Sequence, residues 1–226
     1  MLTFAYARRE IVGIAAAGAA ATAVVGHLLG WWGLLPAAVA GLLLSFYRHP
    51  RRVAPIEPGI ILAPADGKVV EILPQAAGPD EERPVVRLTI FLRIYDVHVN
   101  RSPCGGRVVR VSYRPGRFLN ALRAAASVEN ECSVITLEPD APLPGPIQVR
   151  QIAGVLARRI VCTARGGERL AAGEPFGMIK LGSRTEVCLP QDPRWELLVR
   201  VGQRVAAGRT VLARLRAAPA SETGDD

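Results

Sequence analysis

The chain is short of lysine and of closely spaced cysteines. It has 226 residues with 28 Lys and Arg, but Lys68 and Lys180 are the only lysines, so arginine carries nearly all of the positive charge. Its four cysteines, at positions 104, 132, 162 and 188, form no C-x-x-C pair, which argues against a zinc site or dithiol redox chemistry. No basic run is interleaved with aromatic residues, so the formal charge of +8 favours an anionic membrane surface over nucleic acid as the partner.

Charged residues are also missing near the N-terminus, because no Asp, Glu, Lys or Arg occurs from Ile11 to Tyr47. A helix needs about 20 residues to cross a bilayer core, and residues 11–29 and 31–47 are each near that length. Arginines flank both ends of the run, so the positive-inside rule predicts a hairpin in the cell membrane with the rest of the chain on the cytoplasmic face. A secretory signal peptide and a buried hairpin of a soluble protein are the alternatives.

From Val53 onward, short β-prone runs alternate with Pro-rich and Gly-rich turns. Only Phe118–Ser127 is a good helix candidate, and strands do not alternate with helices as they do in a parallel doubly wound sheet. We therefore predict a mainly β fold with two domains, a helical membrane-anchoring hairpin over 1–52 and a β-rich domain over 53–226. The expected strands are 60–62, 68–73, 85–92, 107–113, 133–137, 147–152, 159–163, 175–179, 185–189 and 210–215.

A weak internal repeat suggests the type of β domain. Gly167–Gly173 reads G-E-R-L-A-A-G and Gly202–Gly208 reads G-Q-R-V-A-A-G, and an apolar run follows each. Such turns are typical of barrel-sandwich folds that resemble biotinyl and lipoyl carriers. They predict a barrel-sandwich-like body and open a rival function, a membrane-anchored carrier or adaptor without catalysis. A carrier needs a lysine at a hairpin tip, and neither Lys68 nor Lys180 is clearly placed at one.

Three segments carry residues suited to nucleophilic chemistry. Gly182 precedes Ser183, and a serine after a flexible glycine can turn its hydroxyl onto the preceding carbonyl, converting the amide to an ester when a base takes the proton. Elimination then cuts the chain before Ser183 and leaves a pyruvoyl group there. Asp66 in a tight turn and His98, the single histidine of the β-rich region, complete an Asp–His–Ser arrangement. Taken alone, each residue also has an ordinary structural explanation as a turn or hydrogen-bonding residue.

Together these segments resemble the short-form phosphatidylserine decarboxylase proenzymes over essentially the whole chain. The motifs are P-A-D-G-K at 64–68, D-V-H-V-N-R-x-P at 96–103 and G-M-I-K-L-G-S-R at 177–184. The resemblance implies a catalytic set of Asp66, His98 and Ser183. It also implies cleavage between Gly182 and Ser183 into a large chain, 1–182, and a small pyruvoyl chain, 183–226, which stay together as a heterodimer.

The same resemblance implies the reaction and marks two departures. A pyruvoyl-dependent carboxy-lyase converts phosphatidylserine to phosphatidylethanolamine and CO2 through a Schiff base, as part of phospholipid biosynthesis, without pyridoxal phosphate or a metal. Longer relatives carry a second histidine where this chain has Arg101, and often a threonine where it has Arg184. A pyruvoyl enzyme acting on a soluble amino acid remains a second rival, which the hydrophobic N-terminus disfavours.

Overall fold

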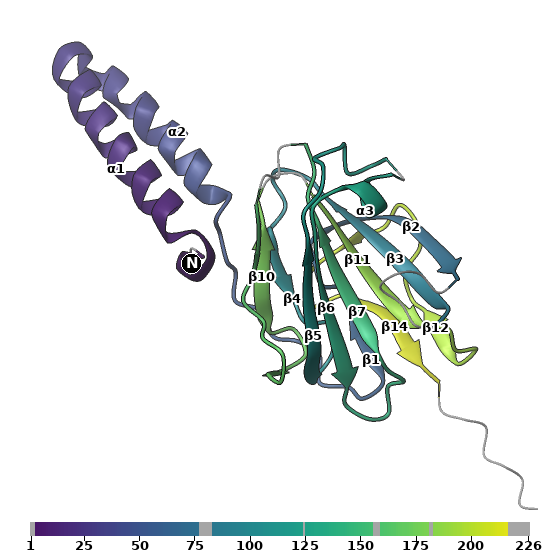
Figure 1. Cartoon of the computed structure of the whole chain (residues 1–226). Coiled ribbons are helices and arrows are strands. Elements are labelled where there is room, and N and C mark those ends of the chain that lie inside the picture. The colour runs from purple at the N-terminus through teal and green to yellow at the C-terminus, as the bar shows by residue number, and fades with distance from the viewer. Residues whose placement is uncertain (1–2, 77–82, 124, 156–158, 181–182, 217–226) are drawn as a thin grey trace, which may run out of the picture.

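The computed structural model describes residues 3–76, 83–123, 125–155, 159–180 and 183–216, and shows a helical hairpin projecting from a β-rich body (Figure 1). The hairpin consists of α1 (Phe4–Leu29), the 3-10 turn η1 (Gly30–Gly33) and α2 (Leu34–Ser45). The protein is mainly β with an N-terminal apolar helical segment, as the sequence predicts.

The hairpin is apolar on its outside and closely packed on its inside. Small residues line the contact between the two helices: Gly18 faces Ala40, and a Cβ built on Gly33 would lie 2.7 Å from the Cα of Gly26. Such small residues let helix backbones approach closely in membranes. Within residues 5–45 an 18-residue window reaches a mean hydropathy of 1.8, so the segment is long and apolar enough to cross a membrane. From Ile11 to Leu29 α1 rises about 27 Å, close to the thickness of a bilayer core.

The described part of the body forms three sheets whose strands pair antiparallel. The large sheet has the order β13-β2-β3-β11-β7-β6-β5-β9, and the small sheets have the orders β1-β14-β12 and β4-β10-β8. The strands are β1 (Ile60–Leu62), β2 (Gly67–Gln75), β3 (Val85–Leu92), β4 (Val99–Arg101), β5 (Gly106–Arg114), β6 (Cys132–Pro139), β7 (Ile147–Ile152), β8 (Ile160–Cys162), β9 (Arg169–Leu170), β10 (Pro175–Ile179), β11 (Ser183–Pro190), β12 (Trp195–Leu197), β13 (Arg204–Val205) and β14 (Val211–Leu215).

All ten expected strands are present, but the expected helix over Phe118–Ser127 is wrong. In the described part of this segment, residues 118–123 and 125 form turns and irregular backbone, and only Ala126 and Ser127 are helical, as the start of the short helix α3 (Ala126–Glu129). Polar side chains hold the turns: the amide of Asn130 bonds the backbone N–H and carbonyl of Leu119, and Asn120 Oδ1 accepts from the N–H of Leu122. Asparagine competes in this way with helical backbone bonds.

The glycine-rich repeat is part of a larger internal symmetry. Gly167 and Gly202 have φ angles of 87° and 94°, and Gly173 and Gly208 have φ angles of 77° and 67°, a region that favours glycine. The two repeats form β9 and β13, which cover opposite edges of the large sheet. The two small sheets also correspond, with β4-β10-β8 matching β1-β14-β12 strand for strand. The body therefore has two similar halves: one is the continuous segment from β4 to β10, and the other combines β1–β3 with β11–β14.

The two halves meet through matching segments. Residues 63–70 read A-P-A-D-G-K-V-V and residues 102–109 read S-P-C-G-G-R-V-V. Their neighbours exchange backbone hydrogen bonds, from Leu62 N to the Pro103 carbonyl at 2.8 Å and from Arg101 N to the Pro64 carbonyl at 2.9 Å. Asp66 corresponds to Gly105 in this alignment, so the second half lacks the carboxylate of the predicted site.

Candidate active site

Ser183 lies at the end of the large sheet, where β11 begins. It pairs with Leu92, the last residue of β3, and it is completely buried. Its Oγ makes no hydrogen bond to any described residue. Gly182, the other half of the predicted cleavage site, falls outside the described residues. A buried hydroxyl without a partner is costly, and such groups often mark chemistry rather than architecture.

His98 directly precedes β4 and is also completely buried. Its Nδ1 lies 2.8 Å from the backbone carbonyl of Asp96, so Nδ1 carries the proton and donates it, which leaves Nε2 as an acceptor. Nε2 has no partner among the described residues. Burial lowers the pKa of His98 to about 4, against the opposing effects of the Asp96 carbonyl and carboxylate. At neutral pH the ring is therefore uncharged and has a free lone pair.

A buried polar chain connects the strands that carry these two residues. Asn100 on β4 donates to Thr185 Oγ1 on β11 at 3.0 Å, and Gln151 on β7 donates to Asn100 Oδ1 at 2.9 Å. His98 and Ser183 each stand two residues earlier than the joined pair, and alternate side chains of an extended chain share a face. Each of His98 and Ser183 therefore stands two residues before one member of the Asn100–Thr185 pair, and no hydrogen bond of the described residues joins their own side chains.

Asp66, the predicted triad acid, has other partners in this structure. Its carboxylate accepts two hydrogen bonds from the Arg52 guanidinium and one, at 2.8 Å, from the N–H of Ala207. Asp66 and His98 both lie in the described part of the chain, and no hydrogen bond joins them. The Nδ1 of His98 instead donates to the backbone carbonyl of Asp96. The Asp66 charge contributes a small rise to the pKa of His98. Its orienting role remains a prediction.

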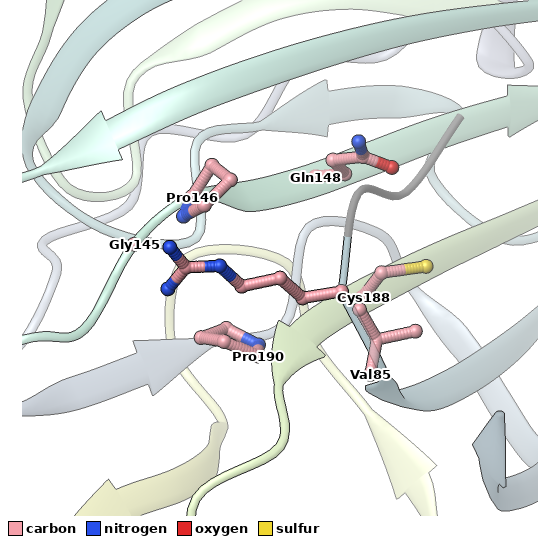
Figure 2. A pocket seen from close by; sticks show the side chains of 7 residues that line it. Val85, Gly145, Pro146, Gln148, Cys188 and Pro190 are labelled. Carbon is pink, nitrogen blue, oxygen red and sulfur yellow. The ribbon is translucent and has the colours of Figure 1, made fainter. Parts of the chain in front are cut away.

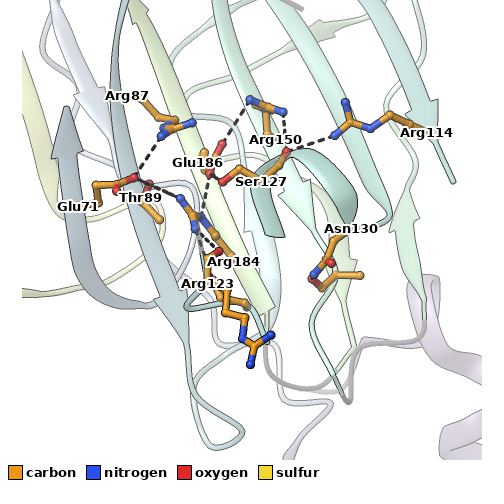
Figure 3. Close-up of polar contacts among 12 residues, drawn as sticks. Glu71, Arg87, Thr89, Arg114, Arg123, Ser127, Asn130, Arg150, Arg184 and Glu186 are labelled. Atoms are coloured by element: carbon orange, nitrogen blue, oxygen red, sulfur yellow. Dashed lines mark hydrogen bonds and ion pairs between the residues drawn. The ribbon is translucent and has the colours of Figure 1, made fainter. Parts of the chain in front are cut away.

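The residue after Ser183 points to the other face of β11 and joins a buried ion-pair network (Figure 3). Arg184 Nε lies 2.7 Å from Glu186 Oε1, and Arg184 Nη2 lies 3.2 Å from Glu71 Oε2 on β2. The side chains of Arg184 and Glu186 are 5% and 0% exposed, whereas that of Glu71 is 31% exposed. Two strands of the sheet are therefore tied together directly beside Ser183.

The segment between β5 and β6 also contacts this network, through Ala121 and Ser127. Arg184 Nη1 also lies 3.4 Å from the carbonyl of Ala121, and Ser127 Oγ donates to Glu186 Oε1 at 2.8 Å. Arg150 on β7 lies 3.5 Å from Glu186 Oε2 and donates to the Ser127 carbonyl at 3.1 Å. Sequence reasoning missed Glu71 and Glu186; the signal available was a pair of charges, Arg184 and Glu186, on one face of an otherwise apolar strand.

The sequence matches a known protein family over most of its length. A family model described as phosphatidylserine decarboxylase matches residues 39–213, a stretch that includes Asp66, His98 and Ser183. The chain belongs to the phosphatidylserine decarboxylase family. The family supports a decarboxylase as the activity of the chain.

Several relatives are named phosphatidylserine decarboxylase proenzyme. The protein of Rhodopirellula baltica is 49% identical over 192 residues, which cover 81% of this chain and 77% of the relative. That of Nitrobacter winogradskyi is 44% identical over 189 residues, covering 82% and 73%. That of Mycobacterium tuberculosis strain H37Rv is 44% identical over 203 residues, covering 87% and 84%. The relatives' name implies a precursor that is processed.

No group of three or more His, Cys, Asp or Glu side chains in the described ranges could hold a metal ion. A small pocket lies at the opposite end of β11 from Ser183, and Figure 2 shows the side chains around it. It is lined by Arg83, Val85, Gly145, Pro146, Gln148, Cys188 and Pro190. Because β11 separates the two places, this pocket is not part of the Ser183 site.

Proposed function

We propose that the chain is a precursor that cuts itself between Gly182 and Ser183, and that the cleaved protein decarboxylates phosphatidylserine to phosphatidylethanolamine. One observation carries the proposal: a buried serine hydroxyl and a neutral, buried imidazole nitrogen are both without partners among the described residues, and each stands two residues before one member of the Asn100–Thr185 hydrogen bond. The motifs that contain them and the relatives named proenzyme support the same assignment.

The proposed cleavage uses groups of this chain. His98 Nε2 takes the hydroxyl proton of Ser183, and Oγ attacks the carbonyl carbon of Gly182 as the bond to the Ser183 nitrogen breaks, which produces an ester. Loss of the α proton of Ser183 then expels Oγ with the Gly182 carboxylate. This leaves a dehydroalanine at position 183. Water then hydrolyses it to the pyruvoyl group, and its nitrogen leaves as ammonia. Asp66 is proposed to stabilise the imidazolium electrostatically.

The residues present fit a pyruvoyl group at position 183. The orphaned Oγ of Ser183 is the atom that cleavage removes, and the position stays bonded to Arg184, which the buried network holds. The pyruvoyl ketone supplies an electron sink for an α-amino carboxylate that loses CO2, so we propose no pyridoxal phosphate and no metal. We propose that His98 holds or delivers a proton at this position.

The two chains are proposed to remain one protein after cleavage. The small chain, 183–226, contributes β11, which pairs on one side with β3 and on the other with β7, both from the large chain. The hairpin is proposed to hold the protein in the cell membrane with the body on the cytoplasmic face, because Arg8, Arg9 and Arg48 flank the apolar run. A lipid substrate is then available at the base of the hairpin.

The decisive experiment compares the masses of wild type, Ser183→Ala and Ser102→Ala. Ser102 is a matched control because it is equally buried but bonds the Cys104 carbonyl. We expect wild type and Ser102→Ala to yield residues 1–182 and a pyruvoyl-blocked piece of residues 183–226, and Ser183→Ala to stay intact and inactive on phosphatidylserine. An intact wild-type chain that still decarboxylates the lipid would show that the pyruvoyl mechanism is wrong.

A further inference from the structure

The segment that leaves the hairpin, residues 46–52, contacts the candidate site at several points. Phe46 at the end of α2 is 9% exposed, and its ring centroid lies 4.3 Å from that of His98 with the planes tilted by 42°. Two residues later, Arg48 donates a hydrogen bond to the carbonyl of Tyr95, in the loop that leads to His98. The hairpin therefore ends directly on the predicted base.

The contacts of this segment continue as far as the predicted acid, Asp66. The carbonyl of Pro50 accepts a hydrogen bond from Arg101 at 3.0 Å, and Arg52 binds the Asp66 carboxylate and the carbonyl of Ala207, the latter at 2.8 Å. The residue between them, Arg51, is exposed. Phe46 and Tyr47 still belong to the turn that ends α2, and residues 48–52 then run along the body.

The start of the hairpin is fastened at the same place. Thr3 Oγ1 donates to the carbonyl of Tyr47 at 3.0 Å and lies 3.8 Å from the sulfur of Met178 on β10. Glu10 on α1 pairs with Lys180, which follows β10 by one residue. The hairpin is thus attached to the body beside the site by several polar contacts, and it is not joined by a free linker.

We propose that residues 46–52 form a positioning strap that makes the membrane hairpin part of the active site. The ring of Phe46 covers and orients His98, and the guanidinium of Arg52 fixes the Asp66 carboxylate. This inference rests on the roles proposed above for His98 and Asp66. It adds that the hairpin does more than anchor the protein, because its base holds the site in shape.

The test measures self-cleavage of the full-length chain in detergent micelles by intact mass over time. Phe46→Ala is compared with Leu42→Ala, which lies one turn earlier on α2 and is 72% exposed. We expect Phe46→Ala to cleave at least about tenfold more slowly, since small displacements of catalytic groups cost about that much or more. Leu42→Ala should cleave at the wild-type rate, and both variants should stay in the membrane fraction.

Two further comparisons separate positioning from general damage. Phe46→Leu keeps an apolar cover on His98 and should recover part of the rate. Arg52→Met should slow cleavage, whereas Arg51→Met, with its exposed side chain, should not. If Phe46→Ala does not fold, Phe46→Leu and Arg52→Met still decide the question against their controls.

The pH dependence of cleavage gives a readout that a purely structural role does not move. The charged groups that act on His98 are Asp96, Arg48 and Asp66, and all remain in Phe46→Ala. Removing the cover lets water reach the ring, so the pKa of His98 rises from about 4 toward its ordinary 6.5. The acid limb of the cleavage profile should move upward by at least about one pH unit.

Two results would overturn the strap. One is a Phe46→Ala chain that cleaves at the wild-type rate with an unchanged acid limb. The other is a control that loses as much of the cleavage rate as its test variant, either Leu42→Ala compared with Phe46→Ala or Arg51→Met compared with Arg52→Met. Failure of the underlying function looks different, because wild type itself would then remain uncut. The outcomes for the strap and for self-cleavage are therefore distinguishable.

Discussion

Removing the arginine beside Ser183 should destabilise the protein strongly. In Arg184→Met the side chain keeps its length but loses its charge, so Glu186, which is 0% exposed, loses its 2.7 Å ion pair. Glu71 loses one partner, and the carbonyl of Ala121 loses its 3.4 Å contact. The variant thus leaves the buried carboxylate of Glu186 with fewer positive charges to balance its own charge.

The expected loss follows from the burial of the pair. Removing one partner of a buried ion pair typically costs about 3–5 kcal/mol, because the remaining charge stays desolvated. Arg150 also contacts Glu186, at 3.5 Å, so we expect the lower end of that range, about 3 kcal/mol. Arg87→Met is the matched control, because Arg87 pairs with Glu71 and the two side chains are 14% and 31% exposed, so neither partner is as buried as Glu186 and the loss should be smaller than in Arg184→Met.

The assay is urea unfolding in detergent micelles, with every variant made in the Ser183→Ala background so that a single uncut chain unfolds. The quantity compared is the change in the free energy of unfolding. A loss below about 1 kcal/mol in Arg184→Met, or no larger than in Arg87→Met, would refute the argument that the network is a buried, coupled unit. Arg184→Lys should recover part of the loss, because it restores the charge but not the guanidinium geometry.

Three further predictions concern the chemistry. His98→Ala and Asp66→Asn should each leave an uncleaved precursor by intact mass; rapid cleavage in either removes that residue from the catalytic set. Because burial holds the pKa of His98 near 4, the wild-type cleavage rate should be flat around neutral pH and fall as the ring gains its proton near pH 4; a fall already at pH 6.5 contradicts the buried neutral base. Phosphatidylserine in micelles should be decarboxylated much faster than free serine, and hydroxylamine but not a chelator should inactivate the enzyme; equal turnover of free serine counts against a lipid substrate.

Much of the architecture could be predicted from local patterns. The run from Ile11 to Tyr47 predicts the hairpin because it has no charged side chain and is long enough for two helices that each cross a bilayer core. The ten predicted strands correspond to observed ones, since β-branched runs bounded by Pro and Gly have few other conformations. The helix predicted over Phe118–Ser127 fails because Asn120 and Asn130 hold the segment in turns, and Asn130 does so from beyond the end of the predicted helix.

For the candidate site too, the sequence and the tertiary structure determined different properties. The sequence by itself determined which groups are available, namely Asp66, His98 and the Gly182-Ser183 step, because their chemistry and motif context are local properties. Only the tertiary structure decided their surroundings: Asp66 binds Arg52, His98 lies against Phe46 and the Asp96 carbonyl, and Arg184 pairs with Glu71. Most of these contacts join residues far apart in the chain, and burial, pKa and charge pairing depend on which distant segments fold together.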